Sequence, residues 1–75
     1  MQTNLNILHL GRQAVVESVN TEPLLRQRLQ DFGLVPGTRV CCRYRTPCGS
    51  VTAVELRGSV VALRTQDLGK IRVRC

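Results

Sequence analysis

Cysteine side chains carry most of the chemical reactivity of this chain, and their spacing does not form a recognisable site. Cys41 and Cys42 are adjacent, so on a strand their side chains would point to opposite faces. Neither this pair nor Cys48 and Cys75 show the Cys-x-x-Cys spacing of a structural zinc site, so we expect no bound metal. Cys42 is predicted to pack as a small hydrophobic residue, and the other three are predicted to be reduced thiols, more or less exposed.

Catalytic groups of other kinds are also missing from the sequence. His9 is the only histidine, and it lies in an apolar N-terminal arm. The five carboxylates form no paired motif, there is no glycine-rich phosphate loop, and no serine or cysteine has an identifiable base partner. These absences predict a protein that is not an enzyme and that holds no cofactor.

Length and hydropathy limit the architecture. A chain of 75 residues allows one domain, over residues 1–75, and at this size folding buries only about 60% of the surface of the unfolded chain. A large internal active site is therefore not expected. The apolar runs are shorter than the roughly 20 residues of a membrane-spanning helix, and residues 1–5 do not resemble a secretory signal. We infer a cytoplasmic protein.

Positive charge is concentrated in the second half of the sequence. The net charge is +6, and the three arginines and three carboxylates of residues 1–38 cancel, so the whole excess comes from residues 39–75. Arginines alternate with apolar positions over residues 39–45, which predicts a strand with one basic face. Such a face suits simple solvation, an acidic protein partner, anionic lipid or nucleic acid.

The best-specified local structure is a helix end. Leu29 and Phe32 continue an apolar helical spacing that predicts a helix over residues 22–32. Gly33 then stands where a helix-ending residue takes positive φ, which glycine adopts without a Cβ clash. Leu34 follows where a Schellman motif places its apolar contact, against Leu29.

A tight turn follows this helix end. Pro36 and Gly37 suit the central pair of a type II turn, because proline presets φ at the first position and glycine tolerates positive φ at the second. A junction of this kind fixes geometry and performs no chemistry. We therefore predict structural roles for Gly33, Pro36 and Gly37, and expect function from a surface that the fold presents.

The remaining pattern predicts a small sheet. Five strands are expected, and so many in so short a chain close best as a barrel, which also limits exposed strand edges. The helix falls between the first and second strands, a single helical turn precedes the last strand, and an apolar arm at residues 5–10 is expected to lie across the core. The expected strands cover residues 13–19, 39–45, 51–56, 60–65 and 70–74.

The order and spacing of these signals resemble the FeoA family, small cytoplasmic proteins of bacterial ferrous-iron uptake. Residues 28–38 match the family pattern of a basic helix that runs into Leu-x-x-(Leu/Phe)-Gly-Leu-x-Pro-Gly-Thr, and residues 54–73 resemble its closing strands. The resemblance implies a mainly β, SH3-like five-stranded barrel and an association with iron transport and transition metal ions. It implies no catalysis. It also implies a role beside FeoB, a membrane permease with a cytoplasmic GTP-binding domain.

We expect a non-catalytic accessory protein that docks on such a permease and touches the membrane only through it. Arg39, Arg43 and Arg45 are the predicted contact residues, because their phase on the strand turns them outward. The alternative is a small basic barrel that binds RNA or another nucleic acid through its Lys and Arg surface. The aromatic residues argue against it, since only Phe32 and Tyr44 could stack on bases and both are expected to be buried.

Overall fold

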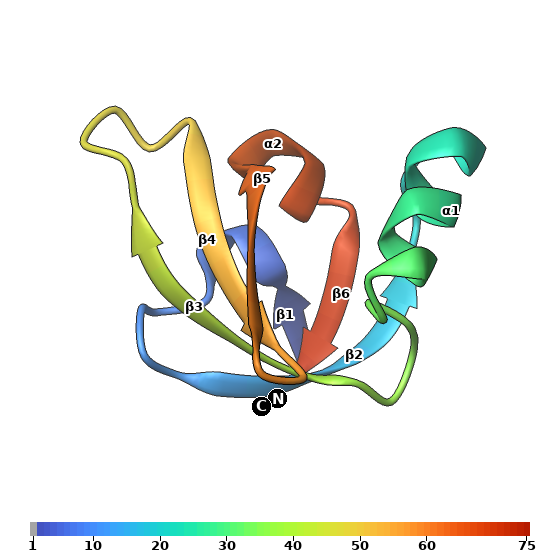
Figure 1. Cartoon of the computed structure of the whole chain (residues 1–75). Coiled ribbons are helices and arrows are strands. Elements are labelled where there is room, and N and C mark those ends of the chain that lie inside the picture. Colours follow the sequence, from blue (N-terminus) through green and yellow to red (C-terminus); the bar gives the residue numbers. More distant parts are fainter. Residues whose placement is uncertain (1) are drawn as a thin grey trace.

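A computed structural model describes residues 2–75, so Met1, the first residue of the predicted domain, lies outside the described part of the chain. These residues form one curled antiparallel sheet with helix α1 beside it (Figure 1). The strands follow the order β1-β6-β2-β3-β4-β5. The elements are β1 (Gln2–Asn4), η1 (Leu5–Ile7), β2 (Gln13–Val19), α1 (Pro23–Asp31), β3 (Arg39–Arg45), β4 (Val51–Leu56), β5 (Ser59–Arg64), α2 (Thr65–Leu68) and β6 (Ile71–Arg74).

The mainly β architecture and the helix between the first two predicted strands are confirmed, with one strand more than expected. The additional strand is β1, which precedes the predicted apolar arm and pairs with β6 in the register Gln2↔Arg74. β1 and β5 end the sheet order, so within residues 2–75 no strand pairing closes the sheet on itself. The sheet is therefore a curled, open form of the expected barrel.

One apolar core fills the inside of the curl. The arm contributes to it as expected, because Leu5 and Leu8 are buried, whereas Ile7 and Leu10 remain exposed. α1 contributes the buried Leu29. The other buried members come from the strands, from α2 and from the junction after α1: Ala14, Val16, Val19, Leu34, Val40, Cys42, Val54, Leu56, Leu68, Ile71 and Val73.

The end of α1 has the hydrogen bonds of a Schellman motif. Gly33 has a φ of +93°, its N–H donates to the carbonyl of Gln30, and the N–H of Leu34 donates to the carbonyl of Leu29 at 2.8 Å. Leu34 turns into the core and is only 1% exposed. Phe32, which was expected to be buried, is 55% exposed, because the chain leaves the helix there and Leu34 fills the core position instead.

The Pro36-Gly37 turn also has the predicted geometry. Gly37 has a φ of +93°, and the N–H of Thr38 donates to the carbonyl of Val35 at 3.0 Å across the turn. The hydroxyl of Thr38 donates to the carbonyl of Gly33 at 2.8 Å, so the turn and the helix end support each other.

A β-bulge in β3 changes which side chains face outward. The register pairs Cys42 with Val54 but Tyr44 with Ala53, so Arg43 is one extra residue on the β3 side. The extra residue shifts the alternation by one position, and Tyr44 therefore joins Arg43 on the outer face, where it is 61% exposed. The prediction that Tyr44 is buried, and that alternation continues to Arg45, is wrong for this reason.

Candidate functional site

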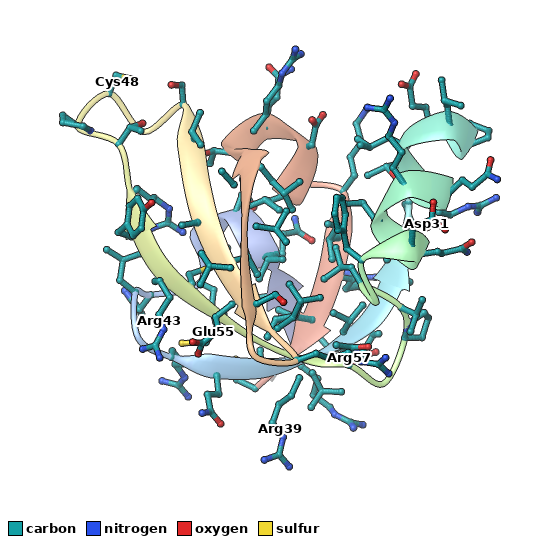
Figure 2. All side chains as sticks on the ribbon, viewed as in Figure 1. Asp31, Arg39, Arg43, Cys48, Glu55 and Arg57 are labelled. Carbon is teal, nitrogen blue, oxygen red and sulfur yellow. The ribbon has the colours of Figure 1, made fainter. Side chains whose placement is uncertain are left out.

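The outer face of β3 carries two of the three predicted contact arginines. Arg39 and Arg43 are both exposed, and Figure 2 shows Arg39 extending away from the ribbon at the start of β3. Among residues 2–75, Arg39 has no carboxylate within ion-pair distance. Its charge is therefore open to a partner, and its role in binding one stays a prediction.

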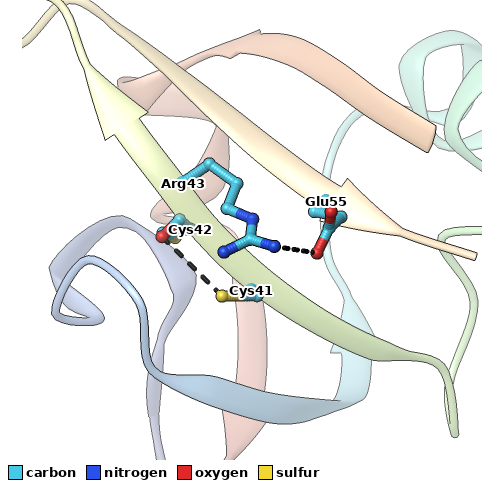
Figure 3. Close-up of polar contacts among 4 residues, drawn as sticks. All are labelled: Cys41, Cys42, Arg43 and Glu55. Carbon is cyan, nitrogen blue, oxygen red and sulfur yellow. Dashed lines mark hydrogen bonds and ion pairs between the residues drawn. The ribbon is translucent and has the colours of Figure 1, made fainter. Parts of the chain in front are cut away.

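Arg43 is held in place by a neighbouring strand. Its Nη2 lies 2.9 Å from Oε1 of Glu55 on β4 (Figure 3). The hydrogen bond and the charge of Glu55 raise the pKa of Arg43 above its ordinary value. Because both side chains are substantially solvent-exposed, this ion pair adds little to stability, but it fixes the direction of the guanidinium.

Arg45 has a structural position and does not belong to the outer face. Its Nη2 donates to the main-chain carbonyls of Asn6 at 2.8 Å and Leu8 at 2.9 Å, and its Nε donates to Oγ1 of Thr52 at 3.3 Å. The prediction that Arg45 turns outward is therefore wrong, because the bulge directs it to the inner side at the end of β3. There it ties η1 and the arm to the sheet.

Two of the four cysteines are buried and two are exposed. Cys42 is buried as predicted, and burial raises the pKa of its thiol. Cys41 is also buried, contrary to the expectation of an exposed thiol. It lies between Gln13 and Glu55 in the register of β2, β3 and β4, and Figure 3 shows it beneath Arg43.

Cys48 is exposed in the β3–β4 loop and has an acidified thiol. Oγ of Ser50 lies 3.0 Å from its Sγ and Oγ1 of Thr46 lies 3.6 Å away. The hydrogen bonds from the Ser50 side chain and backbone, with that from Thr46, lower the pKa of Cys48 to about 7, because they favour the thiolate. Within the described residues, no three His, Cys, Asp or Glu side chains are grouped closely enough to hold a metal ion.

A groove lies between α1 and strand β5. Its volume is about 480 Å³. Its walls combine charged and apolar side chains: Thr21, Glu22, Leu25, Arg28, Ala62, Leu63, Arg64, Asp67 and Lys70. No local sequence pattern indicates this groove, because its two walls are about 40 residues apart in the chain and meet only in the folded protein.

The N-terminal end of α1 has Glu22 as its N-cap residue, and among the described residues no side chain donates or accepts a capping hydrogen bond there. Oγ1 of Thr21 is buried without a hydrogen-bond partner among the described residues. Pro23 at the first helical position has no N–H to satisfy, which reduces the need for a side-chain cap.

The family model for the FeoA domain matches residues 3–75, which is nearly the whole chain. The chain belongs to the FeoA family. The resemblance drawn from residues 28–38 is thus confirmed, and the family links the chain to ferrous iron transport. None of the curated protein sequences matches the chain.

Solved structures of FeoA proteins have the same fold. FeoA from Chlorobium tepidum is 33% identical with a TM-score of 0.93, and the match covers 96% of this chain and 69% of that protein. A FeoA-like protein from Clostridium acetobutylicum is 27% identical with a TM-score of 0.85, and the match covers 97% of this chain and 85% of that protein. The SH3-like fold expected for this FeoA chain is thus confirmed.

A zinc complex is known for another FeoA protein. FeoA from Stenotrophomonas maltophilia is 29% identical with a TM-score of 0.82, and the match covers 95% of this chain and 88% of that protein. That protein is described as a prokaryotic SH3 domain protein complexed with zinc and as a suggested activating factor of ferrous iron transport. In the present FeoA chain, no helix within residues 2–75 is long and apolar enough to cross a membrane.

Proposed function

We propose that this FeoA chain is a non-catalytic, cytoplasmic accessory protein that docks on the cytoplasmic GTPase part of a FeoB-type ferrous iron permease and modulates it. Membership of the FeoA family supports the link to ferrous iron transport. The observation that carries the docking proposal is the outer face of β3, where Arg39 and Arg43 stand exposed beside Tyr44. This face, defined by these three residues, is called the β3 face below.

The charge distribution favours an acidic partner for the β3 face. The chain has a net charge of +6, and the described residues place the unpaired guanidinium of Arg39 on this face. Opposite charges on two proteins accelerate their encounter, and salt screens this attraction over about 8–10 Å at physiological ionic strength. Binding through the β3 face is therefore expected to weaken as salt is raised.

Two charge-reversal variants test the docking proposal. Arg39→Glu together with Arg43→Glu should weaken binding to the purified cytoplasmic part of the permease by roughly tenfold, since each reversal replaces an attractive charge by a repulsive one. Arg26→Glu together with Arg28→Glu changes the net charge equally on exposed positions of α1 and should weaken binding much less. Affinities are measured by biolayer interferometry, and circular dichroism checks the fold of each variant.

The control pair decides whether the β3 face is the contact surface. If both double variants lose affinity equally, the effect is one of overall charge and the β3 face is not the contact. If the β3 double variant folds and binds as the natural protein does, docking does not use this face either.

Nucleic-acid binding is a second candidate function, because the structure changes the main argument against it. Tyr44 is 61% exposed next to Arg43, and an exposed aromatic ring beside a guanidinium can stack on a base. Fluorescence anisotropy with single-stranded RNA over a salt series tests this candidate. Salt-sensitive binding that Tyr44→Ala abolishes, with no binding to the permease, would replace the docking proposal.

A further inference from the structure

Strand β5 leaves one edge of the sheet open. In the part of the chain that the structure describes, it ends the sheet order and pairs only with β4, over six residue pairs without a bulge. Proteins usually protect such edges with proline, bulges, lysine or very short strands. β5 contains no proline, glycine or lysine, and its only charged residue is Arg64 at its end. The other edge strand, β1, has just three residues.

The alternation of hydrogen-bonded and non-hydrogen-bonded pairs between β4 and β5 shows which main-chain groups of β5 face the open side. The N–H of Thr65 donates to the carbonyl of Ser50 at 2.9 Å, so these two residues form a hydrogen-bonded pair that continues the β4–β5 ladder. Hydrogen-bonded and non-hydrogen-bonded pairs alternate in an antiparallel ladder. The N–H and C=O groups of Val60 and Ala62 and the N–H of Arg64 therefore point away from β4, whereas the C=O of Arg64, the N-cap residue of α2, belongs to that helix.

The groove described above runs along this open edge. Ala62 and Leu63 line it on the β5 side, and Leu25 lines it on the α1 side. Leu25 and Leu63 are partly buried against the core, so an apolar side chain entering here would meet apolar surface. A volume of about 480 Å³ lies in the range of pockets that bind ligands of appreciable size.

The charges around the groove favour an acidic occupant. Arg28, Arg64 and Lys70 line it against Glu22 and Asp67, which leaves one positive charge in excess at the groove. These five groups belong to a chain whose total net charge is +6. A segment with alternating apolar and acidic residues matches both the apolar walls and this charge.

We propose that the open edge of β5 binds an extended acidic segment of a partner protein, which adds a strand to the sheet in the groove beside α1. Main-chain hydrogen bonds to Val60, Ala62 and Arg64 supply the attachment, and the groove selects the side chains. This inference does not depend on the proposed permease contact, because the β3 face lies on another part of the molecule.

A second copy of this chain is a poorer occupant of the same edge. Two copies would bring two net charges of +6 together, which opposes association. α1 also bounds the groove on the side opposite β5, so an incoming β5 from a second copy would have to bring its own β4 and α1 into the same narrow space.

Hydrogen exchange followed by NMR tests the proposal on the reduced full chain. The probe is the peptide acetyl-Glu-Val-Asp-Val-Glu-Val-Asp-amide at millimolar concentration. Exchange of the amides of Val60, Ala62 and Arg64 should slow by roughly tenfold or more on addition of the peptide. The amides of Val61 and Leu63 already bond to β4, so their exchange should change little.

Three controls make the experiment decisive. The same peptide with N-methylated backbone amides should give no protection, and a Lys-Val repeat of equal length should give less. Ala62→Pro removes the outward N–H without removing a donor to β4, so it should abolish protection at Val60 and Arg64. Protection that survives N-methylation, or no protection by the acidic peptide, overturns the proposal. Protection in the free chain that depends on protein concentration also overturns it, in favour of a second copy.

Discussion

Replacing Arg45 with methionine removes the link between the N-terminal arm and the sheet while keeping most of the apolar stem. The guanidinium donates to the carbonyls of Asn6 and Leu8 and to the hydroxyl of Thr52. Hydrogen bonds that involve a charged group contribute about 1.5–3 kcal/mol each when fully buried. Arg45 is only partly buried, so water can satisfy some of the freed groups, and the expected net loss is about 2–4 kcal/mol.

The expected loss is large for a chain of this size. In a domain of 60–100 residues, 1 kcal/mol lowers the melting temperature by about 4–8 °C, so Arg45→Met should lower it by about 8–32 °C. Urea unfolding measures the free energy, and far-UV circular dichroism with a reductant present is the suitable signal because the chain has no tryptophan and four cysteines.

Arg43→Met and Arg45→Lys are the matched controls. Arg43 lies two positions earlier on the same strand but makes only an exposed ion pair, so its loss should leave the unfolding midpoint nearly unchanged. Arg45→Lys keeps a charged donor near both carbonyls and should recover part of the stability. If Arg45→Met unfolds at the natural midpoint, or if Arg43→Met is equally destabilised, the structural role of Arg45 is refuted.

Two further predictions concern the turns and the acidified thiol. Gly33→Ala and Gly37→Ala should each lower the free energy of unfolding by about 1–2 kcal/mol, because both glycines have a φ of +93°. The two losses should be similar, because a Cβ on Gly33 would meet only the exposed side chain of Arg57, which can move aside, and a Cβ on Gly37 meets nothing within 4 Å. A much larger loss at Gly33 in urea unfolding would contradict this. Alkylation of Cys48 should rise with pH, with a midpoint at pH about 7, because the thiolate is the reactive form. Ser50→Ala should move that midpoint upward in peptide-resolved mass spectrometry, and an unmoved midpoint would exclude the hydroxyl as the cause.

The candidate site was only partly predictable from the sequence. Arg39 and Arg43 are exposed on β3 as the alternation predicts. Beyond them, the bulge exchanges the roles of Tyr44 and Arg45, and no residue type near it marks the insertion. The stability of the bulge involves carbonyls of the N-terminal arm, 37 and 39 positions away, which the local pattern of β3 does not contain.

The sequence by itself determined the helix end, the Pro36-Gly37 turn and the strand pattern, because these depend on φ preferences and on side-chain alternation over a few neighbouring residues. Only the tertiary structure decided that Gln2–Asn4 pairs with β6, that Arg45 turns inward to the carbonyls of the N-terminal arm and that β5 has an open edge beside α1. Each of these features depends on main-chain groups that are far apart in sequence and come together only when the sheet curls.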